Sequence, residues 1–494
     1  MNYSIIFKMV SLLMAVLGTA FSLCAIVAAA HSDNAADAES LPSWICILSL
    51  TFMIALSLYL PTKNAPRRIF RKEALCVVGV GWILAAFVGA LPYIFIRQCG
   101  LADALFESAS GITTTGASVF GDVESMPKSL LFWRALSQWI GGLGVVVFFV
   151  AVFSFMGSGA KLMYSHEASV SANGAIEAER IKSAILKIFL LYAGISAACL
   201  TVFRVCGMGW FDGTCHMLAT VSTGGFSVYN DSIAHYSSAL ISWAVTFFMF
   251  AGGISFFALL ALARGSVAKF ASNLETLAYA AILAAATLAV AAIGMGAEGC
   301  AEPEKWWNCL TEAAFQCVSI MTTTGFSTAD YQKWTPGTHM ILFVLMIVGG
   351  CACSTSGGLK VSRALAALKL LSRETEKVLR PRIVRAVRID KKIFDPSDTT
   401  SLFAFVSLYA ATALFGALAV AAAEPDMSFT GALSSAVSAV SNVGPGLNEV
   451  GPMENYGFMT DASKTVLCIL MLMGRVEFYS ILILFMPSLW KRFQ

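Results

Sequence analysis

The sequence predicts an all-α membrane protein with ten transmembrane helices plus four shorter re-entrant helices. Three observations support this fold class: the composition, the length of the apolar runs, and a loop that recurs four times. Apolar residues make up 57% of the 494 residues and charged residues only 13%, about half the roughly 25% of a soluble globular protein. The mean hydropathy is +0.75. So little charge cannot solvate a soluble body of this size, and a net charge of +3 is too small to indicate a nucleic-acid-binding protein.

A transmembrane helix needs about 20 mainly apolar residues to cross a hydrocarbon core of roughly 30 Å. Ten segments reach or approach this length, at 9–30, 44–61, 74–96, 130–155, 183–205, 238–263, 275–294, 338–357, 399–423 and 464–488. The first also has features of a signal peptide, since Lys8 precedes an apolar stretch that ends in Ala28-Ala29-Ala30. It is longer than the usual 7–15 apolar residues of such a peptide, which favours a membrane span.

Basic residues predict the orientation, because loops rich in Lys and Arg stay on the cytoplasmic side. Residues 31–43 contain no Lys or Arg, whereas residues 62–73 carry five. The first loop is therefore expected outside and the second inside, and ten crossings put both termini in the cytoplasm. From Lys360 to Lys392 there are eleven basic residues against three acidic ones. This is typical of a solvated inner rim, and also of a docking surface for an anionic partner or lipid head groups.

The most informative feature is a Thr/Gly loop that occurs four times, each time after a short helical segment. The central glycines are 108, 101 and 119 residues apart. The four copies are Thr113-Thr114-Thr115-Gly116, Ser222-Thr223-Gly224-Gly225, Thr322-Thr323-Thr324-Gly325 and Ser441-Asn442-Val443-Gly444. One such loop is typical of an ordinary turn. Four copies at similar spacing predict a unit of span, short helix, loop and span that is used four times.

This repeat divides the chain into five parts. Residues 1–73 hold two extra N-terminal transmembrane helices, 74–165 form repeat 1, and 166–270 form repeat 2. Residues 271–392 form repeat 3 together with the basic cytoplasmic segment, and 393–494 form repeat 4.

The short segments predict the chemistry of the loops. About 10–14 helical residues extend only about 15–21 Å, too little to cross a membrane. Re-entrant backbone is tolerated at membrane depth only where protein buries it or water lines it. The four repeats, each of a first span (M1), a short re-entrant helix (P) and a second span (M2), are therefore expected around a pseudo-fourfold pore. Glycine lets successive carbonyl groups turn toward the pore axis. Carbonyl and hydroxyl oxygens can replace the hydration shell of an alkali cation, and the negative ends of the short helices would face the same cavity. The loops therefore predict a cation filter without an acidic ring.

These loops resemble the four filter loops of the Trk/Ktr/HKT potassium transporters. The segment Trp133-Arg134-Ala135-Leu136-Ser137-Gln138-Trp139-Ile140-Gly141-Gly142 is also similar to its family counterpart, and the two extra N-terminal spans match the TrkH branch rather than the shorter KtrB branch. The resemblance covers essentially the whole chain. It implies potassium-selective, channel-like uptake, with potassium as the transported ligand and no cofactor. The implied potassium-binding residues are Thr114, Thr115, Gly116, Ser222, Thr223, Gly224, Thr323, Thr324, Gly325, Asn442, Val443 and Gly444.

The resemblance also implies an assembly and a location. It implies a homodimer in the bacterial inner (plasma) membrane, in contact with membrane lipid, with both termini cytoplasmic. It implies a cytosolic TrkA-like regulator that binds nucleotides, and no nucleic-acid partner. Some plant relatives have serine at the position of Gly116, so glycine there favours potassium over sodium by the same analogy.

The eighth span ends in an unusual run of small residues, Gly349-Gly350-Cys351-Ala352-Cys353-Ser354-Thr355-Ser356-Gly357-Gly358-Leu359-Lys360. Glycine costs about 1 kcal/mol relative to alanine inside a helix, so a break is expected. Small residues would alternatively permit close helix contact. In the resembled family this stretch is an intramembrane loop that obstructs the pore until the regulator acts. The implied gating residues are Gly349, Gly350, Gly357, Gly358 and Lys360, while Cys353 and Ser356 replace the family's usual glycines, which puts the mobility of the loop in question.

Three charged residues in the spans need an explanation. Arg475 and Glu477 interrupt the last span, where a charge costs roughly 2.5–3.5 kcal/mol without partners or water. Positions two apart do not share a helix face, so the two are not expected to neutralise each other. Arg475 resembles the pore arginine of the family. The resemblance implies that Arg475 is a sixth gating residue, whose positive charge repels the cation. The alternative is that Arg475 belongs to a buried structural ion pair. Arg134, near the outer end of its span, is expected to snorkel in a structural role.

Two other functions deserve comparison with this one. An ion-coupled secondary cation symporter would also contain discontinuous helices, but it predicts two inverted repeats with midplane acids rather than four repeats of the same sense. In a membrane hydrolase, Gly116-Ala117-Ser118 would be the nucleophile turn. None of the five histidines lies in the middle of a predicted span to act as its base, so an enzyme is not expected.

Two pairs of the thirteen cysteines share a spacing of nine on the predicted outer side, Cys206 with Cys215 and Cys300 with Cys309. The sequence favours free thiols and leaves disulfides open, because spacing alone does not show that either pair meets.

Overall fold

The structure is a computed structural model that describes residues 2–65, 71–155, 174–293, 303–380, 388–389, 392–393 and 396–487. The helical elements in chain order are α1 (Tyr3–Ala30), α2 (Ala35–Thr62), α3 (Arg71–Gly89), η1 (Tyr93–Arg97), α4 (Leu101–Ile112), α5 (Lys128–Phe155), α7 (Gly174–Val205), α8 (Trp210–Val221), η2 (Ser232–Tyr236), α9 (Ala239–Gly252), α10 (Phe256–Ala263), α11 (Val267–Ala271), α12 (Leu274–Ile293), α14 (Pro303–Met321), η3 (Tyr331–Lys333), α15 (Pro336–Val348), α16 (Val361–Leu379), α17 (Pro396–Ala423), α18 (Phe429–Ser441), η4 (Asn448–Val450), α19 (Asp461–Arg475), α20 (Tyr479–Leu482) and η5 (Ile483–Phe485). The strands β1 (Arg388–Ile389) and β2 (Lys392–Ile393) pair antiparallel, with Arg388 opposite Ile393.

The helices confirm the predicted class of a helical membrane protein. Within the described ranges, six helices are long and apolar enough to cross a membrane, and two further pairs bent at a break raise the number to eight. The six long helices and the two bent pairs correspond to eight of the ten predicted spans. The other two predicted spans correspond to α5, with 28 residues, and α15, with 13 residues.

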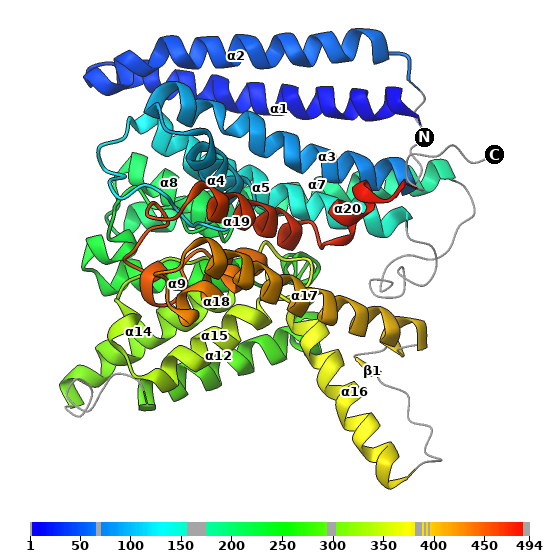
Figure 1. The fold of residues 1–494 in the computed structure, drawn as a ribbon. Helices are drawn as coiled ribbons and strands as arrows, with labels where there is room; N and C mark the ends of the chain where they lie inside the picture. Colours follow the sequence, from blue (N-terminus) through cyan, green and yellow to red (C-terminus); the bar gives the residue numbers. More distant parts are fainter. Residues whose placement is uncertain are drawn as a thin grey trace.

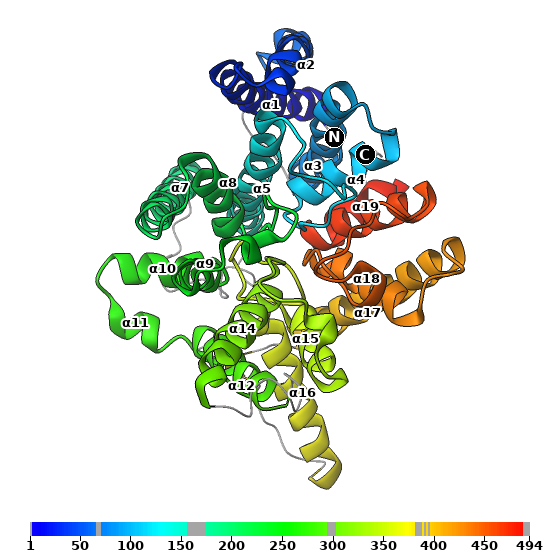
Figure 2. The same cartoon turned by 90° about the vertical axis from the view of Figure 1, so that its left-hand side faces the viewer.

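Four helix triplets follow the antiparallel pair α1 and α2 (Figure 1). In each triplet a short helix packs between two neighbours, as α3–α4–α5, α7–α8–α9, α12–α14–α15 and α17–α18–α19. The triplets contact one another in a closed order, since α5 packs on α8, α9 on α14, α15 on α18, and α19 on α4. Figure 2 shows α4, α8, α14 and α18 around a common centre. This closed order matches the four repeats that the sequence predicts.

Two predicted spans are bent rather than continuous. α9 and α10 meet at 105°, and α19 meets the segment of α20 and η5 at 112°. The predicted spans at 238–263 and 464–488 therefore each contain a break, which the sequence prediction did not include. At the second break Glu477 and Phe478 have φ angles of 56° and 52°, in the left-handed region through which a right-handed helix cannot continue.

The glycine-rich stretch after α15 is broken, as predicted. α15 ends at Val348 because Gly349 takes a φ of 70°, whereas the predicted span continued to residue 357. A helix of 13 residues extends only about 20 Å. The small residues also allow close contact, because an added β-carbon on Gly357 would lie less than 3.0 Å from the carbonyl oxygen of Ser441.

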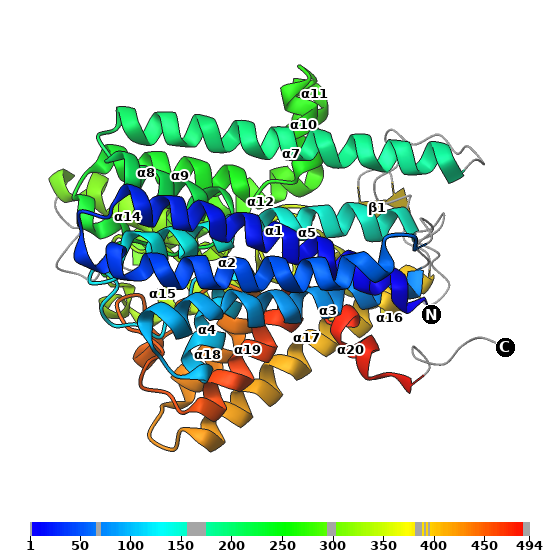
Figure 3. The same ribbon diagram turned by 90° about the horizontal axis from the view of Figure 1, so that it is seen from above.

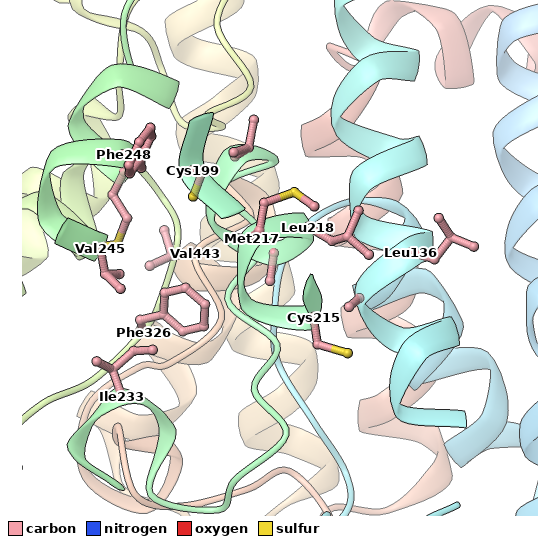
Figure 4. Close-up of a cluster of buried hydrophobic side chains, with 14 of the residues drawn as sticks. Leu136, Cys199, Cys215, Met217, Leu218, Ile233, Val245, Phe248, Phe326 and Val443 are labelled. Atoms are coloured by element: carbon pink, nitrogen blue, oxygen red, sulfur yellow. The ribbon is translucent and has the colours of Figure 1, made fainter. Parts of the chain in front are cut away.

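The lengths of the short helices agree with the prediction in three repeats. α4, α8 and α18 have 12, 12 and 13 residues, but α14 has 19, so the predicted length of 10–14 residues is wrong for repeat 3. A large hydrophobic core lies between α1, α5, α7, α8 and α9. Figure 4 shows part of it, where Met217 and Leu218 of α8 lie between Leu136 of α5 and Val443 of the fourth loop. This core holds loops that are far apart in the sequence in one place.

The beginning of α1 and the short helix α20 lie at the same end of the molecule (Figures 1 and 3). This is the arrangement that an even number of membrane crossings requires. The basic helix α16 extends away from the helix bundle on the side opposite α1 and α2 (Figures 1 and 2).

Candidate functional site

The four Thr/Gly loops share one backbone conformation although their sequences differ. In each loop one polar residue has a left-handed φ: 55° at Thr114, 51° at Thr223, 57° at Thr323 and 57° at Asn442. Two residues later a glycine is also left-handed: 83° at Gly116, 85° at Gly225, 79° at Gly325 and 103° at Gly444. Residues other than glycine rarely adopt this region, and such strain concentrates at functional sites. The same pair of left-handed residues, a polar one and a glycine, therefore occurs in all four repeats.

This conformation shifts the second loop by one residue relative to the sequence prediction. The prediction took Gly224 as the central glycine, but Gly225 has the conformation of Gly116. Ser222 caps the end of α8 in the way that Thr113 caps the end of α4. The loop of repeat 2 is therefore Thr223-Gly224-Gly225. The sequence could not decide the register, because both adjacent residues are glycine.

The four loops enclose one axis. At each left-handed glycine an added β-carbon would lie less than 3.0 Å from the carbonyl oxygen just before the glycine of the next repeat. The pairs are Gly116 with the oxygen of Gly224, Gly225 with that of Thr324, Gly325 with that of Val443, and Gly444 with that of Thr115. The amide Nδ2 of Asn442 also donates to Thr115 Oγ1 at 3.0 Å. Since this series runs through all four repeats and returns to the first, the loops form a closed ring, which we call the carbonyl ring (the oxygens of Thr115, Gly224, Thr324 and Val443).

Three oxygens of the carbonyl ring have no donor among the described residues. Thr115, Thr324 and Val443 are fully buried, and no hydrogen bond reaches their carbonyl groups within the described ranges. The Gly224 carbonyl accepts a hydrogen bond from Gln138 Nε2 at 2.6 Å. Buried carbonyl groups are nearly always paired in proteins. Three unpaired carbonyl groups in one closed ring therefore form a site that water or a cation would satisfy.

The carbonyl ring is open on one side and closed on the other. On the predicted outer side, a cavity of about 130 Å³ is lined by all four left-handed glycines and by Arg134. On the opposite side, the stretch of residues 349–360 contacts the loops, and a small cavity of about 10 Å³ beside it lies between Gly357, Tyr409 and Arg475. That volume is at the lower limit for a single water molecule.

The closed side is formed by the segment between α15 and α16, residues 349–360, which we call the glycine-rich segment. It contains the five predicted gating residues Gly349, Gly350, Gly357, Gly358 and Lys360. The Gly357 amide donates to Thr323 Oγ1 at 2.7 Å, and the Gly358 amide donates to the carbonyl of Ser441 at 3.0 Å. The hydroxyl of Thr355 donates to the carbonyl of Gly252 at 3.1 Å. The segment thus contacts repeats 2, 3 and 4 directly beneath the loops.

One carboxylate that the sequence prediction missed holds both ends of this segment. Glu275, at the start of α12, accepts hydrogen bonds from the amides of Ala352 at 2.6 Å and Ser362 at 3.2 Å. The only sequence signal is an acid at the cytoplasmic start of an apolar span, which is too common to predict this role.

Arg475 ends α19 and contacts the glycine-rich segment. It is 3% exposed, and its Nη1 donates to the carbonyl of Thr355 at 2.7 Å. Its Nη2 reaches the carbonyl of Gly141 in repeat 1 at 3.5 Å. Glu477 pairs with Arg363 at 2.7 Å, so the prediction that Arg475 and Glu477 do not neutralise each other is confirmed. Arg475 has no carboxylate partner among the described residues, and the alternative of a buried ion pair is not found there.

Arg134 has a structural role, as predicted, but it does not snorkel. It is 2% exposed, and its Nε donates to Glu107 Oε1 at 2.8 Å. Its Nη1 donates to the carbonyl of Ser227 in the second loop at 3.0 Å, and Glu107 also accepts from the amide of Val119 at 3.1 Å. The prediction of snorkelling is wrong because Glu107, an acid inside the short helix α4, provides a buried partner that the sequence prediction did not consider.

Replacing Glu107 with alanine is expected to lower the free energy of unfolding by about 3–5 kcal/mol, because Arg134 would remain buried without its partner. The measurement is thermal unfolding of the purified protein in detergent. Glu374→Ala is the matched control: this carboxylate pairs with Arg373 and Lys377 on the surface of α16, where solvent screening makes ion pairs weak. Equal melting temperatures for the two variants would contradict the assigned role of Glu107.

The prediction that the cysteines of both pairs are free thiols is confirmed for one pair only. Cys206 and Cys215 are free, as predicted, and Cys215 is buried in α8. Cys309 is disulfide-bonded, so the prediction of a free thiol is wrong at that position. Cys300 lies outside the described residues.

Comparisons with known proteins identify the family and the overall fold of the chain. A family model described as TrkH, cation transport protein, matches residues 46–293 and 303–492. The chain is 29% identical to the Trk system potassium uptake protein TrkH of Halomonas elongata over 91% of this chain and 92% of that protein. It is 29% identical to the protein of the same name from Escherichia coli over 99% of this chain and 100% of that protein. The crystal structure of the potassium transporter TrkH from Vibrio parahaemolyticus is similar with a TM-score of 0.89 and 27% identity, over 99% and 100% of the two chains.

Proposed function

The chain belongs to the TrkH family of cation transport proteins, and we propose that it is a potassium-selective, channel-like uptake protein of the bacterial inner (plasma) membrane. Membership of this family makes it an integral membrane transporter and not an enzyme. The curated relatives are named as Trk system potassium uptake proteins. The observation that supports selective permeation best is the carbonyl ring formed by all four repeats.

The chemistry of the carbonyl ring suits a monovalent cation. Its members are neutral carbonyl oxygens, and oxygens of this kind replace the hydration shell of potassium in selective filters. Sites for calcium and magnesium are instead usually built with carboxylates, and no residue of the four loops from Thr113 to Gly116, 222–225, 322–325 and 441–444 is acidic. The last turns of α4, α8 and α18 come directly before the loops. Their partial negative charges favour a cation at the axis.

From the family membership and the packing of the helices, we also propose an arrangement of spans, repeats and termini. Ten transmembrane helices and four re-entrant helices form four M1-P-M2 repeats after the two N-terminal spans, with the five-part division at residues 73, 165, 270 and 392. Both termini are cytoplasmic, which the common end of α1 and α20 supports. By analogy with the family, the protein is a homodimer that binds a cytosolic TrkA-like nucleotide-binding regulator.

The glycine-rich segment and Arg475 form the gate in this proposal. The segment itself, in direct contact with the loops, and the guanidinium of Arg475 both oppose a cation that leaves the ring toward the cytoplasm. Hydrogen bonds from Gly357 and Gly358 to repeats 3 and 4 hold the segment in this position. The regulator would release these contacts.

Purified protein in liposomes is expected to take up rubidium, a potassium substitute, without an imposed proton or sodium gradient. The measurement is ⁸⁶Rb⁺ accumulation into vesicles loaded with potassium chloride, with and without competing sodium outside. Potassium should compete and sodium should not. Gly225→Ala is the matched inactive control, because its β-carbon would collide with the carbonyl of Thr324. Uptake that needs a sodium or proton gradient would support the alternative of an ion-coupled symporter instead.

A further inference from the structure

The backbone of the second loop is hydrogen-bonded to a side chain of α5 that has no counterpart in the other repeats. Gln138 of α5 donates from Nε2 to the carbonyl of Gly224 at 2.6 Å and accepts at Oε1 from the amide of Phe226 at 3.1 Å. Its side chain is fully buried. The two hydrogen bonds fix the backbone of the loop on both sides of Gly225, the left-handed glycine of this repeat.

The equivalent helix positions in the other repeats carry methionine. Gly141, Gly252 and Gly474 mark one position, since an added β-carbon on each approaches a carbonyl at the end of a short helix. The oxygens are those of Ile112 and Val440 at less than 3.0 Å and that of Val221 at 3.4 Å. Three residues earlier stand Gln138, Met249 and Met471, and Met346 precedes Gly349 by the same interval in repeat 3. Methionine has no N–H group that could donate to a carbonyl.

The loop residue that faces Gln138 is adapted to it. Gly224 occupies the position of Thr115, Thr324 and Val443 in the other loops. An added β-carbon on Gly224 would lie less than 3.0 Å from Cδ of Gln138. The amide thus fills the room that a threonine or valine side chain needs. Repeat 2 therefore has a glutamine–glycine pair where the other repeats have methionine with threonine or valine.

We propose that Gln138 is a positioning residue that makes the filter asymmetric and sets its preference for potassium over sodium. This inference rests on the proposed function of the carbonyl ring as a potassium filter. Three ring oxygens are available to a cation, whereas the Gly224 oxygen is engaged by the amide. Sodium is smaller than potassium, so carbonyl groups must move inward to coordinate it, and selectivity depends on how far they can follow the ion. A ring oxygen fixed by Gln138 resists that movement, which disfavours sodium.

Two variants test this assignment. Gln138→Met copies the other three repeats and removes both hydrogen bonds. Gln138→Glu keeps the size and an acceptor for the Phe226 amide, but a carboxylate cannot donate to the Gly224 carbonyl. For both variants the ratio of sodium to potassium concentrations that halve ⁸⁶Rb⁺ uptake into liposomes is expected to fall by about fivefold or more, the effect of one net hydrogen bond. The gain in melting temperature in potassium chloride over sodium chloride should shrink in parallel.

Gln332→Met is the matched control. The Nε2 of Gln332 donates to the carbonyl of Asn448 at 2.7 Å, outside the carbonyl ring, so this variant should keep the wild-type ratio. Wild-type ratios in folded Gln138→Met and Gln138→Glu proteins would overturn the inference, and if the methionine variant does not fold, the glutamate variant decides alone. Failure of the proposed function is distinguishable, because the wild type itself would then show no preference for potassium, and the inference would fall with it.

Discussion

Gly116→Ser is expected to lower the discrimination of potassium against sodium by about tenfold or more, equivalent to about 1.4 kcal/mol of selectivity. Gly116 has a φ of 83°, and an added β-carbon would lie less than 3.0 Å from the carbonyl oxygen of Gly224. Serine must therefore push a ring oxygen out of its position, and the serine hydroxyl adds a polar group that suits a smaller ion. The measurement is the permeability ratio of the two cations in reconstituted vesicles.

Gly265→Ser separates this collision from backbone strain. Gly265 has nearly the same φ, 77°, but no atom lies within 4 Å of an added β-carbon. Its serine variant carries the conformational cost alone and should keep the wild-type permeability ratio. An unchanged ratio in Gly116→Ser would contradict the assignment of Gly116 to the filter.

Arg475→Ala is expected to raise the basal rubidium flux, measured without the regulator, by about tenfold or more. The change removes a buried positive charge next to the conduction path, and a like charge at short range opposes a cation by one to several kcal/mol at the dielectric constants of protein sites. It also removes the hydrogen bond to the carbonyl of Thr355, 2.7 Å long, which helps to hold the glycine-rich segment. The measurement is ⁸⁶Rb⁺ uptake into liposomes of the purified protein.

Two further variants identify the origin of this effect. Arg475→Lys keeps the charge but loses the two-armed contact with the carbonyls of Thr355 and Gly141, so a low flux in this variant assigns the barrier to the charge. Arg204→Ala removes another guanidinium that donates to a backbone carbonyl, that of Met208 in the turn between α7 and α8. It should leave the flux unchanged. A wild-type flux in Arg475→Ala would remove Arg475 from the barrier.

Local patterns in the sequence predicted the loops of the candidate site well. Thr114 and Gly116 belong to a short motif whose repetition at similar intervals is visible without any structure. The register of the second loop was not predictable, because Gly224 and Gly225 are equally permissive as residues and only the surrounding backbone distinguishes them. Gln138 belongs to the segment from Trp133 to Gly142 that resembles the family, but its role depends on a hydrogen bond to a residue 86 positions away. Glu107 was missed for the same reason.

The sequence by itself determined that this is a helical membrane protein with four repeats of one loop, because apolar length, charge content and glycine positions are properties of neighbouring residues. The tertiary structure alone decided the bends after α9 and α19, the burial of Arg134, and which carbonyl oxygen each of the four loops brings to the ring. Each of these depends on which distant segments meet: Glu107 removes the need for Arg134 to reach water, and the oxygens of the carbonyl ring come from four different repeats. Such contacts depend on the packing of the whole chain, so no single segment contains the information to predict them.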